Sequence, residues 1–236
     1  MGLIDIVVLV PVYQRPGRVR SLLDSFDQSR PTNARLLFVA SPGDTAELFA
    51  LADLPHLVVP FRQGRGDWAK KINWGYRHTT EPWLLCAADD IRFHKGWDRA
   101  LRRAMKTGKR VLGTNDLNPH ANPENIYSPH PLVARSYADE RGTVDKRRRV
   151  VCEDYHHNYP DRELAATAIS RDEWLYVPDA VLEHLHPGWT DTPADETYRL
   201  GARFGQRDYL LHVRRHRLWK REQRIRERAL RNANPH

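Results

Sequence analysis

Two adjacent aspartates interrupt an apolar segment in the first half of the chain. The segment CAADDIRF, residues 86–93, places Asp89 and Asp90 directly after an apolar run that reads as a buried strand. Like charges repel at close range, and burying them costs free energy. A solvated turn without a ligand is the alternative to a binding role. Because a cation at this place would offset the repulsion, the pair predicts a cationic partner.

The elements that must position this pair are predicted from the first ninety residues. We expect strands at 5–13, 34–44, 56–61 and 82–89, and helices at 15–26, 45–54 and 66–79. This alternation is typical of an α/β fold with a mainly parallel sheet. Ligands of such sheets bind beyond the C-terminal ends of the strands. We therefore expect one crevice to be formed by the segments that follow the strands, which are 11–15, 41–44, 62–66 and 89–90.

The remainder of the chain alternates less regularly. Helices are predicted at 94–106 and 162–170, a strand at 110–116, and one or two strands within 174–187. The proline- and asparagine-rich segment 118–131 is predicted to be a loop. Because the chain contains neither repeats nor a low-complexity linker, we expect one domain with a helical C-terminal extension.

Composition and charge limit the class of protein. Hydrophobic residues make up 40% and charged residues 29% of the chain, a balance typical of a soluble globular protein. The longest apolar run is too short to span a bilayer, and the N-terminus lacks a secretion pattern. We therefore expect a cytoplasmic protein in which Cys86 and Cys152 stay reduced. The net charge is +8, and the segment 214–231 contains nine Lys or Arg and two acidic residues, so the basicity is concentrated there.

Four segments together resemble a known family. They are PVYQRPGRV (11–19), KKINWGY (70–76), ADDIRFHKGWD (88–98) and EHLHPGW (183–189). In this order they resemble the family 2-type glycosyltransferases of the GT-A fold. The resemblance implies a Rossmann-like, mainly parallel sheet flanked by helices, to which the charge pattern adds a basic C-terminal helix. We expect a single domain at 1–211, with a nucleotide-sugar-binding half at 1–117 and an acceptor and metal half at 118–211, and an extension at 212–236.

The resemblance supplies a cationic partner for the aspartate pair. Related enzymes carry an Asp-x-Asp motif here, which holds Mn²⁺ or Mg²⁺ against the donor diphosphate. This chain has Ala88-Asp89-Asp90 instead, so the resemblance places Asp90 on the metal and Asp89 near the ribose. A late histidine completes the metal sphere in similar enzymes. His184 and His186 are both candidates, and a packing or surface role is the alternative for each.

A further set of residues is implied to bind the donor, which we expect to be a UDP-sugar. Tyr13 would stack on uracil, and Arg15 would pair with a phosphate. A core position for Tyr13, and solvated positions for Arg65 and Lys71, are the alternatives. The full set is Pro11, Tyr13, Arg15, Asp44, Arg65, Lys71, Asn73 and Asp89.

Sugar transfer also requires a base that accepts the proton of the acceptor hydroxyl. The segment CEDYHHNYPDREL, 152–164, contains the candidates Glu153, Asp154, Asp161 and Glu163. Related enzymes place the base at the start of a helix, which favours Asp161 and leaves Asp154 as the second candidate. Capping of the helix is the alternative role for Asp161. The resemblance implies a hexosyl or pentosyl transferase that inverts the anomeric centre.

The basic C-terminal segment indicates the kind of acceptor. A net charge of +7 over 214–231 suits a polyanion, and DKRRRV (145–150) adds a second basic cluster. Leu211, Leu218 and Ile225 recur every seven residues, a pattern that also fits a helix packed on the domain or a dimer contact. The predicted acceptor-binding residues are Arg147, Arg148, Arg214, Arg215, Arg217, Lys220, Arg221 and Trp189.

The function expected from these observations is metal-dependent transfer from a UDP-sugar to a hydroxyl. The acceptor suggested by the basic segment is a hydroxymethylated DNA base, as for the similar DNA-modifying glycosyltransferases of bacteriophages, which act in the host cytoplasm. The same chemistry on a protein or glycan is one alternative, and anionic membrane lipid is another partner for the basic helix. A non-catalytic nucleic-acid-binding protein is the alternative from another class, but it leaves Asp89, Asp90 and the late histidines without a role.

Overall fold

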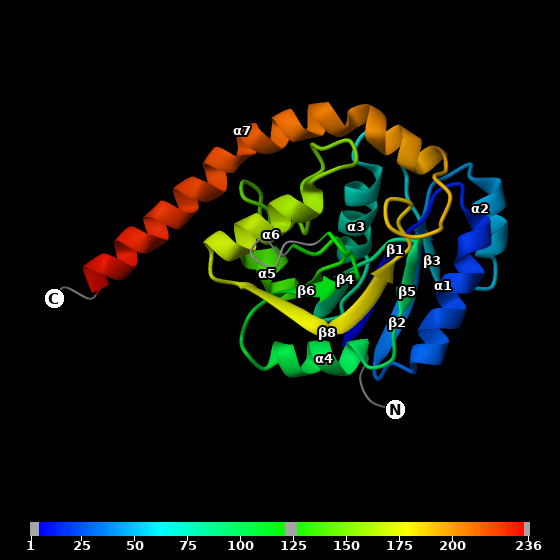
Figure 1. Cartoon of the computed structure of the whole chain (residues 1–236), viewed down its shortest axis with the longest axis horizontal. Helices are drawn as coiled ribbons and strands as arrows, with labels where there is room; N and C mark the ends of the chain where they lie inside the picture. Colours follow the sequence, from blue (N-terminus) through cyan, green and yellow to red (C-terminus); the bar gives the residue numbers. More distant parts are fainter. Residues whose placement is uncertain (1–4, 121–126, 234–236) are drawn as a thin grey trace.

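An eight-stranded sheet with helices on both faces forms the body of the protein (Figure 1). The computed structural model describes residues 5–120 and 127–233. The strand order across the sheet is β3-β2-β1-β4-β7-β6-β8-β5. The strands are β1 (Ile6–Pro11), β2 (Ala34–Ala40), β3 (His56–Val58), β4 (Trp83–Cys86), β5 (Ile91–Phe93), β6 (Val111–Asn115), β7 (Leu132–Ala134) and β8 (Trp174–His184).

The first four strands form a parallel half-sheet, as the alternation of apolar segments predicted. β1 pairs with β2 and β4, and β2 pairs with β3, all in parallel. Every residue of β1 is buried, which explains its continuous apolar sequence. Beyond β4 the sheet is mixed, because β7 runs antiparallel to β4 and β6, and β5 runs antiparallel to β8. The carboxyl ends of β1, β4 and β8 meet at one edge, where the Leu185 amide donates to the Asp90 carbonyl.

Helices cover the sheet on both faces. They are α1 (Pro16–Ser29), α2 (Thr45–Ala50), α3 (Asp67–Arg77), α4 (Trp97–Met105), α5 (Arg135–Glu140), α6 (Pro160–Ser170) and α7 (Glu196–Ala233). Alternate residues of β1 point to opposite faces. Ile6 and Val8 therefore pack with α1 and α4, whereas Val7 and Leu9 pack with α3, α5 and α6. A Cβ at Gly75 would lie 2.6 Å from a Leu9 methyl carbon, so glycine permits α3 to approach β1 closely.

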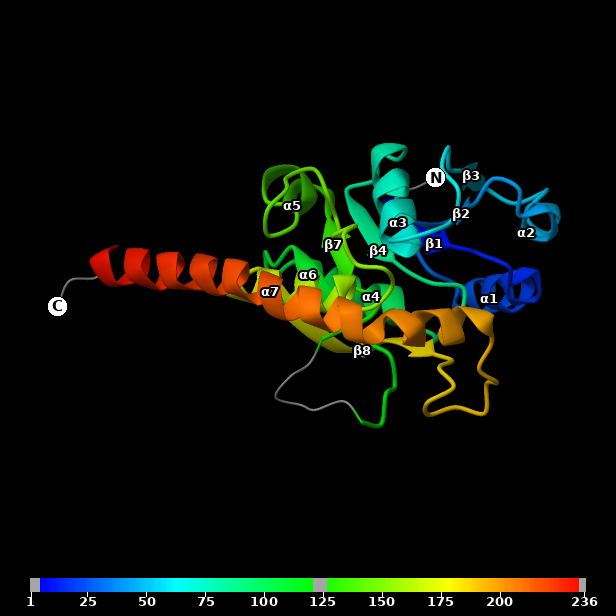
Figure 2. The same ribbon diagram turned by 90° about the horizontal axis from the view of Figure 1, so that it is seen from above.

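α7 is one continuous helix of 38 residues that lies along α6. Both views show its last turns extending away from the body of the protein (Figures 1 and 2). A stripe of polar and aromatic side chains holds it to the body. The stripe consists of Asp208, His212, Arg215, Trp219 and Glu222, which recur every three or four residues, as one face of a helix requires. Asp208 accepts hydrogen bonds from the amides of 156–158 at 2.8–2.9 Å.

The predicted acceptor role of Arg215 is corrected by its environment. Its guanidinium is buried and pairs with Glu163 at 2.6 Å and Asp145 at 2.8 Å. A buried arginine with two carboxylate partners is costly to uncouple, so Arg215 joins α7 to α6 and does not face an acceptor. The predicted apolar stripe is also not the packed face, because Leu218 and Ile225 are 38% and 60% exposed.

Four elements differ from the sequence-based expectation. β5, β7 and α5 were not predicted, because each is short and β7 follows a proline-rich segment directly. α7 begins at Glu196, so the basic segment expected from 212 onward continues a helix that starts within 118–211. Across the described ranges, no helix is both long and apolar enough to cross a membrane.

Candidate active site

A cavity of about 870 Å³ opens at the carboxyl ends of β1 and β4. Three of the four segments expected to form a crevice contribute to its wall, namely 11–15, 62–66 and 89–90, whereas 41–44 does not. The wall is completed by the segments 127–130 and 156–162, by His184, His186 and Trp189, and by the first turns of α7. The cavity therefore joins both halves of the chain.

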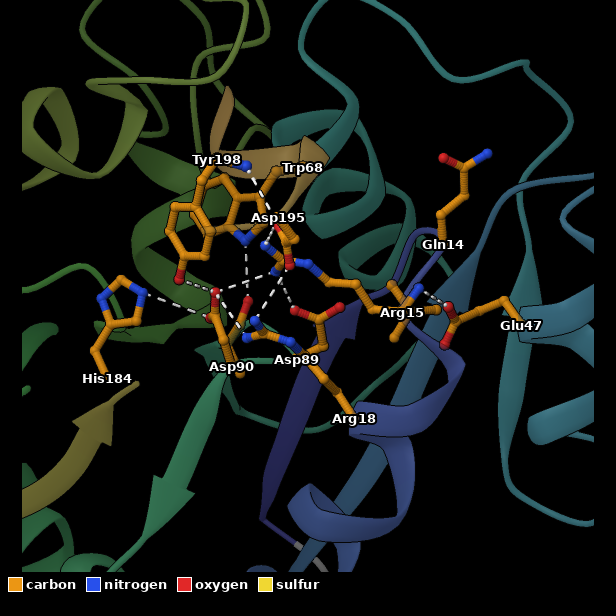
Figure 3. A network of polar contacts seen from close by, with 12 residues as sticks. Gln14, Arg15, Arg18, Glu47, Trp68, Asp89, Asp90, His184, Asp195 and Tyr198 are labelled. Carbon is orange, nitrogen blue, oxygen red and sulfur yellow. Dashed lines mark hydrogen bonds and ion pairs between the residues drawn. The ribbon is translucent and has the colours of Figure 1, made fainter. Parts of the chain in front are cut away.

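Two arginines and three aspartates form a charged network at one end of the cavity (Figure 3). Arg15 Nη1 lies 2.8 Å from Asp89 and 3.1 Å from Asp90, and Arg15 Nη2 lies 2.7 Å from Asp195. Arg18 pairs with Asp90 at 3.6 Å and with Asp195 at 3.2 Å. Tyr198 donates to Asp90 Oδ2 at 2.6 Å, and its ring lies under the Arg15 guanidinium. We call this group of residues the arginine end of the cavity.

The loop after β1 is held in place by α2. The Gln14 amide donates to Asp44 at 2.7 Å, and the Arg15 amide donates to Glu47 at 2.8 Å. Asp44 also caps α2 through the Glu47 amide. Asp44 therefore positions Arg15 and does not line the cavity, which corrects its predicted direct role in donor binding.

The two adjacent aspartates differ in pKa. Burial, followed by the charge of Asp90, raises the pKa of Asp89. Burial also opposes ionisation of Asp90, but His184, Arg15 and Tyr198 outweigh it and hold the pKa of Asp90 well below its ordinary value. Asp90 is thus the carboxylate that this environment keeps ionised.

A divalent metal fits beside Asp90 with few protein ligands. Among residues 5–120 and 127–233, no three or more His, Cys, Asp or Glu side chains are grouped to hold an ion. Two suitable ligands do adjoin, because Asp90 Oδ1, which is buried without a hydrogen-bond partner, lies 3.5 Å from His184 Nε2. Mg²⁺ is commonly held by one or two carboxylates together with substrate phosphates. The pair fits a metal that is shared with a bound diphosphate.

His186 is less suited to be a metal ligand than His184. Its Nδ1 accepts a hydrogen bond from the Gly188 amide at 2.9 Å. Its ring stacks on Trp189 at a centroid distance of 4.2 Å. These contacts hold the turn after β8, so His186 and Trp189 form part of the cavity wall.

Buried polar atoms without a hydrogen-bond partner are concentrated in the cavity wall. Of thirteen such side-chain atoms in the described part of the chain, eight belong to residues that line the cavity. They are Arg15 Nε, Asp67 Oδ1, Asp90 Oδ1, both ring nitrogens of His130, His156 Nε2, His184 Nδ1 and Trp189 Nε1. An unpaired buried polar atom costs about 1–3 kcal/mol. Their clustering gives the cavity a wall that can form hydrogen bonds with water or with a polar ligand.

The four carboxylates considered as bases occupy different environments. Glu163 is buried against Arg215, and Glu153 accepts from Asn73 at 2.9 Å. The Asp154 side chain is 45% exposed and lies outside the cavity wall, which corrects its place as second candidate. Asp161 lies in the first turn of α6 and lines the cavity. Burial raises the pKa of Asp161 above its ordinary value.

Two of the predicted donor-binding residues have structural roles. Lys71 is fully buried, donates to the Val12 carbonyl at 2.7 Å and pairs with Asp67. Asn73 is also fully buried, and it bonds the backbone at Val150 and Val151. Both predictions are corrected, because these side chains face the protein interior. Pro11, Tyr13, Arg15, Arg65 and Asp89 do line the cavity.

The predicted acceptor-binding residues separate into two groups. Trp189 lines the cavity. Arg147 and Arg148 are exposed on the loop whose Asp145 pairs with Arg215, so this loop lies beside α7. From position 214 onward, the exposed basic residues of α7 are Arg214, Arg217, Lys220, Arg221, Arg224, Arg228 and Arg231. These basic side chains lie outside the cavity wall.

Several residues of the site were missed from the sequence. Arg18, Asp195 and Tyr198 belong to the arginine end, and Asp116 and His130 line the cavity near His184. Burial lowers the pKa of His130 to about 3, so its ring is neutral near pH 7. Arg18 was within a quoted motif and could have been found as a second cation after β1. Asp195 and Tyr198 meet their partners from a different part of the chain, and no local pattern marks them.

Known proteins match this chain in fold but not in sequence. No family model and no curated protein sequence matches the chain. The Pyrobaculum calidifontis mannosyltransferase PcManGT, solved with GDP-Man and Mn²⁺, has a TM-score of 0.57 at 15% identity, over 78% of this chain and 57% of its own. Residues 1–349 of S. aureus TarS, solved with UDP, give 0.60 at 12% identity, over 75% of this chain and 59% of its own.

A third structure matches over a larger share of its own length. Glucosyl-3-phosphoglycerate synthase from Mycobacterium tuberculosis, solved with Mn²⁺, UDP-Glc and phosphoglyceric acid, gives a TM-score of 0.54 at 15% identity, over 84% of this chain and 74% of its own. These neighbours are glycosyltransferases of the GT-A type, and the chain has the GT-A fold, as predicted. The chain spans less than two thirds of the length of PcManGT and of the TarS fragment. At these identities the likeness establishes the fold alone.

Proposed function

We propose that the protein is a metal-dependent glycosyltransferase that moves a sugar from a UDP-sugar to an acceptor hydroxyl. The observation that carries the proposal is that Asp90, His184 and Arg15 meet at the carboxyl end of β4. Each of the three has a buried polar atom without a hydrogen-bond partner. Neighbours of the same fold were solved with GDP-Man or UDP-Glc and with Mn²⁺, which supports a nucleotide-sugar donor. Arg15 and Arg18 can donate charge-assisted hydrogen bonds to an anionic diphosphate.

Different residues of the cavity have different roles in the proposed reaction. Arg15 and Arg18 bind the diphosphate, which displaces the Asp195 carboxylate from both. Asp90 and His184 would hold Mn²⁺ or Mg²⁺, whose charge stabilises the leaving diphosphate. Trp68 donates its Nε1–H to the Ala87 carbonyl at 2.9 Å, which fixes its ring in the cavity wall. Asp161 accepts the proton of the attacking hydroxyl.

Nucleotide binding tests the donor. We expect UDP to bind the full chain in the presence of Mn²⁺ and to bind at least about tenfold more weakly with a chelator, because Asp90 and His184 would hold a metal whose charge attracts the diphosphate. Calorimetry with UDP, GDP and ADP, each with and without Mn²⁺, measures this directly. Failure of all three diphosphates to bind in Mn²⁺ would contradict the proposal.

The exposed face of α7 supports a polyanionic acceptor. Seven Lys or Arg side chains are exposed between 214 and 231, and the last turns of the helix extend from the body (Figure 2). Arginines on a helix face contact phosphates more than base edges. We propose a nucleic acid as the acceptor-bearing molecule, with a hydroxyl on a DNA base as the modified group. The base would leave the stack to reach Asp161, at a cost of roughly a few kcal/mol.

Salt dependence tests this surface. We measure how the logarithm of the duplex-DNA binding constant falls with the logarithm of the salt concentration. A variant with glutamine in place of Arg214, Arg217, Arg221 and Arg224 is expected to give a shallower slope. The slope should fall by up to about 0.9 for each phosphate that the variant no longer neutralises. Substitution is preferable to truncation because the segment contains the packed residues Arg215 and Trp219.

The matched control replaces four exposed basic residues on and beside α4, which are Lys95, Arg99, Arg103 and Lys106. The control should keep the slope of the unmodified protein. Equal slopes in all three proteins, with no sugar on hydroxymethylated DNA by nucleoside mass spectrometry, would instead favour a protein or glycan acceptor.

A further inference from the structure

His130 is a buried side chain whose polar atoms have no partner in the described chain. The residue is 3% exposed, it lines the cavity, and neither ring nitrogen makes a hydrogen bond. Its backbone is firmly held, because its amide donates to Ser128 Oγ at 3.2 Å and its carbonyl accepts from Thr114 Oγ1 at 2.8 Å. The fold thus fixes the position of His130 and leaves its imidazole unsatisfied.

The position of His130 follows from a short series of contacts. Arg15 contacts Asp90, Asp90 Oδ1 lies 3.5 Å from His184, and the His184 ring lies 5.1 Å from the His130 ring. If the diphosphate occupies the arginine end, the sugar attached to its outer phosphate must lie farther along the cavity. The His130 ring is one of three that lie 5.1–5.6 Å from the His184 ring, with those of His186 and Trp189, and it lines the same cavity as Asp161.

The chemistry of the surrounding groups suits an uncharged sugar. An imidazole has two ring nitrogens that can take part in hydrogen bonds, and a sugar hydroxyl can both donate and accept a hydrogen bond. Asp116 is buried in the cavity wall, and its backbone carbonyl accepts the His184 amide at 3.0 Å. Its carboxylate, with that of Asp161, can accept hydrogen bonds from hydroxyls but would repel a carboxylate on the sugar.

We propose that His130 is a specificity-determining residue that hydrogen-bonds a hydroxyl of the transferred sugar, and that Asp116, which lines the same cavity, selects uncharged sugars against anionic ones. This inference rests on the proposed function. A sugar hydroxyl would form a hydrogen bond with the His130 imidazole. A ligand that lacks this hydroxyl leaves the imidazole without that bond, and the site therefore discriminates against it.

Calorimetry in Mn²⁺ measures the affinities for UDP, UDP-glucose, UDP-N-acetylglucosamine and UDP-glucuronic acid. Comparison with UDP separates the contribution of the sugar to the affinity from that of the nucleotide. His130→Phe removes both polar atoms and keeps a ring of similar shape. We expect this variant to bind UDP within about twofold of the unmodified protein. We expect it to bind the preferred uncharged UDP-sugar roughly tenfold more weakly, the loss of about one hydrogen bond.

Two further variants and a control sharpen the test. His130→Asn keeps a donor and an acceptor and should bind the preferred sugar better than His130→Phe. Asp116→Asn should narrow the preference for UDP-glucose over UDP-glucuronic acid, because it removes a buried negative charge. His78→Phe changes an exposed histidine outside the cavity and should alter no affinity.

The melting temperature separates a binding role from a structural one. His130→Phe should melt close to the temperature of the unmodified protein, because the ring nitrogens of His130 make no hydrogen bond to another described residue. A lower melting temperature with equal weakening of UDP and UDP-sugars would overturn the inference. So would normal binding of every UDP-sugar by His130→Phe. If the unmodified protein binds no UDP, the proposed function fails first, which is a distinct result.

Discussion

Replacement of Asp161 by asparagine is expected to lower the rate of sugar transfer by about 100- to 10,000-fold, the usual contribution of a general base. UDP binding should stay within about twofold of normal, because Asp161 takes part in none of the ion pairs of the arginine end. Asparagine keeps the size and the polar character of the side chain but cannot accept the proton. Initial rates of transfer, measured beside UDP affinity, separate the two effects.

Asp154→Asn is the matched control for this prediction. Asp154 was the second candidate from the sequence, but its side chain lies outside the cavity wall. Its transfer rate should be close to that of the unmodified protein. A normal rate in Asp161→Asn, or a loss in Asp154→Asn alone, would contradict the assignment of the base.

The raised pKa of Asp161 predicts a pH dependence with a definite sign. A base must be ionised to act, so the transfer rate should rise with pH as Asp161 loses its proton, with a midpoint above that of an ordinary aspartate. A carboxyl whose pKa is raised by folding favours the protonated form of the folded state. Its contribution to stability is present below the unfolded pKa and is lost as the pH rises through the folded pKa. Near pH 7, Asp161→Asn should therefore be at least as stable as the unmodified protein by thermal melting.

Replacement of Asp90 by asparagine is expected to remove the metal dependence of UDP binding. Changes to groups that only support a metal ligand already cost about 10–100-fold in metal affinity, so loss of a direct carboxylate should cost more than about 100-fold. The affinity of this variant for UDP in Mn²⁺ should match its affinity with a chelator. Calorimetry with Mn²⁺ titrated into the UDP-saturated protein measures the loss directly.

The two late histidines provide an internal comparison for this prediction. His184→Asn should weaken Mn²⁺ binding, because His184 adjoins Asp90 Oδ1. His186→Asn should leave Mn²⁺ affinity nearly unchanged, because His186 holds the Gly188 turn and stacks on Trp189. Equal Mn²⁺ affinity in Asp90→Asn and the unmodified protein would remove the metal from the proposal. The reverse order of the two histidine variants would exchange their roles.

The first half of the fold was predictable from the sequence because its signals are local. The apolar runs of β1, β2 and β4 are buried on both faces, and Pro16 begins α1. The Asp89-Asp90 pair was recognised because an apolar strand ends at two charges, and this requires only neighbouring residues. β7 and α5 were missed because short elements carry too few residues for a period to be detected.

The partners of charged side chains could not be predicted, because residues far apart in the chain supply them. Arg215 has the same local sequence context as the exposed Arg214, yet it is buried against Glu163 and Asp145. Lys71 and Asn73 matched a donor-binding pattern, but α3 turns both side chains into the interior. Among the four acidic residues of 152–164, the start of α6 places Asp161 in the cavity wall.

The sequence by itself determined the α/β alternation, the strand ends at which a ligand would bind, and the residue types that suit a metal and a diphosphate. Only the tertiary structure placed His184 next to Asp90 and joined Tyr198 to Asp90 across 108 positions of the chain. It also placed His130 beside His184 without a polar partner. The physical reason is that strand and helix formation depends on neighbouring residues, whereas burial, ion pairing and unsatisfied polar atoms depend on packing between distant segments.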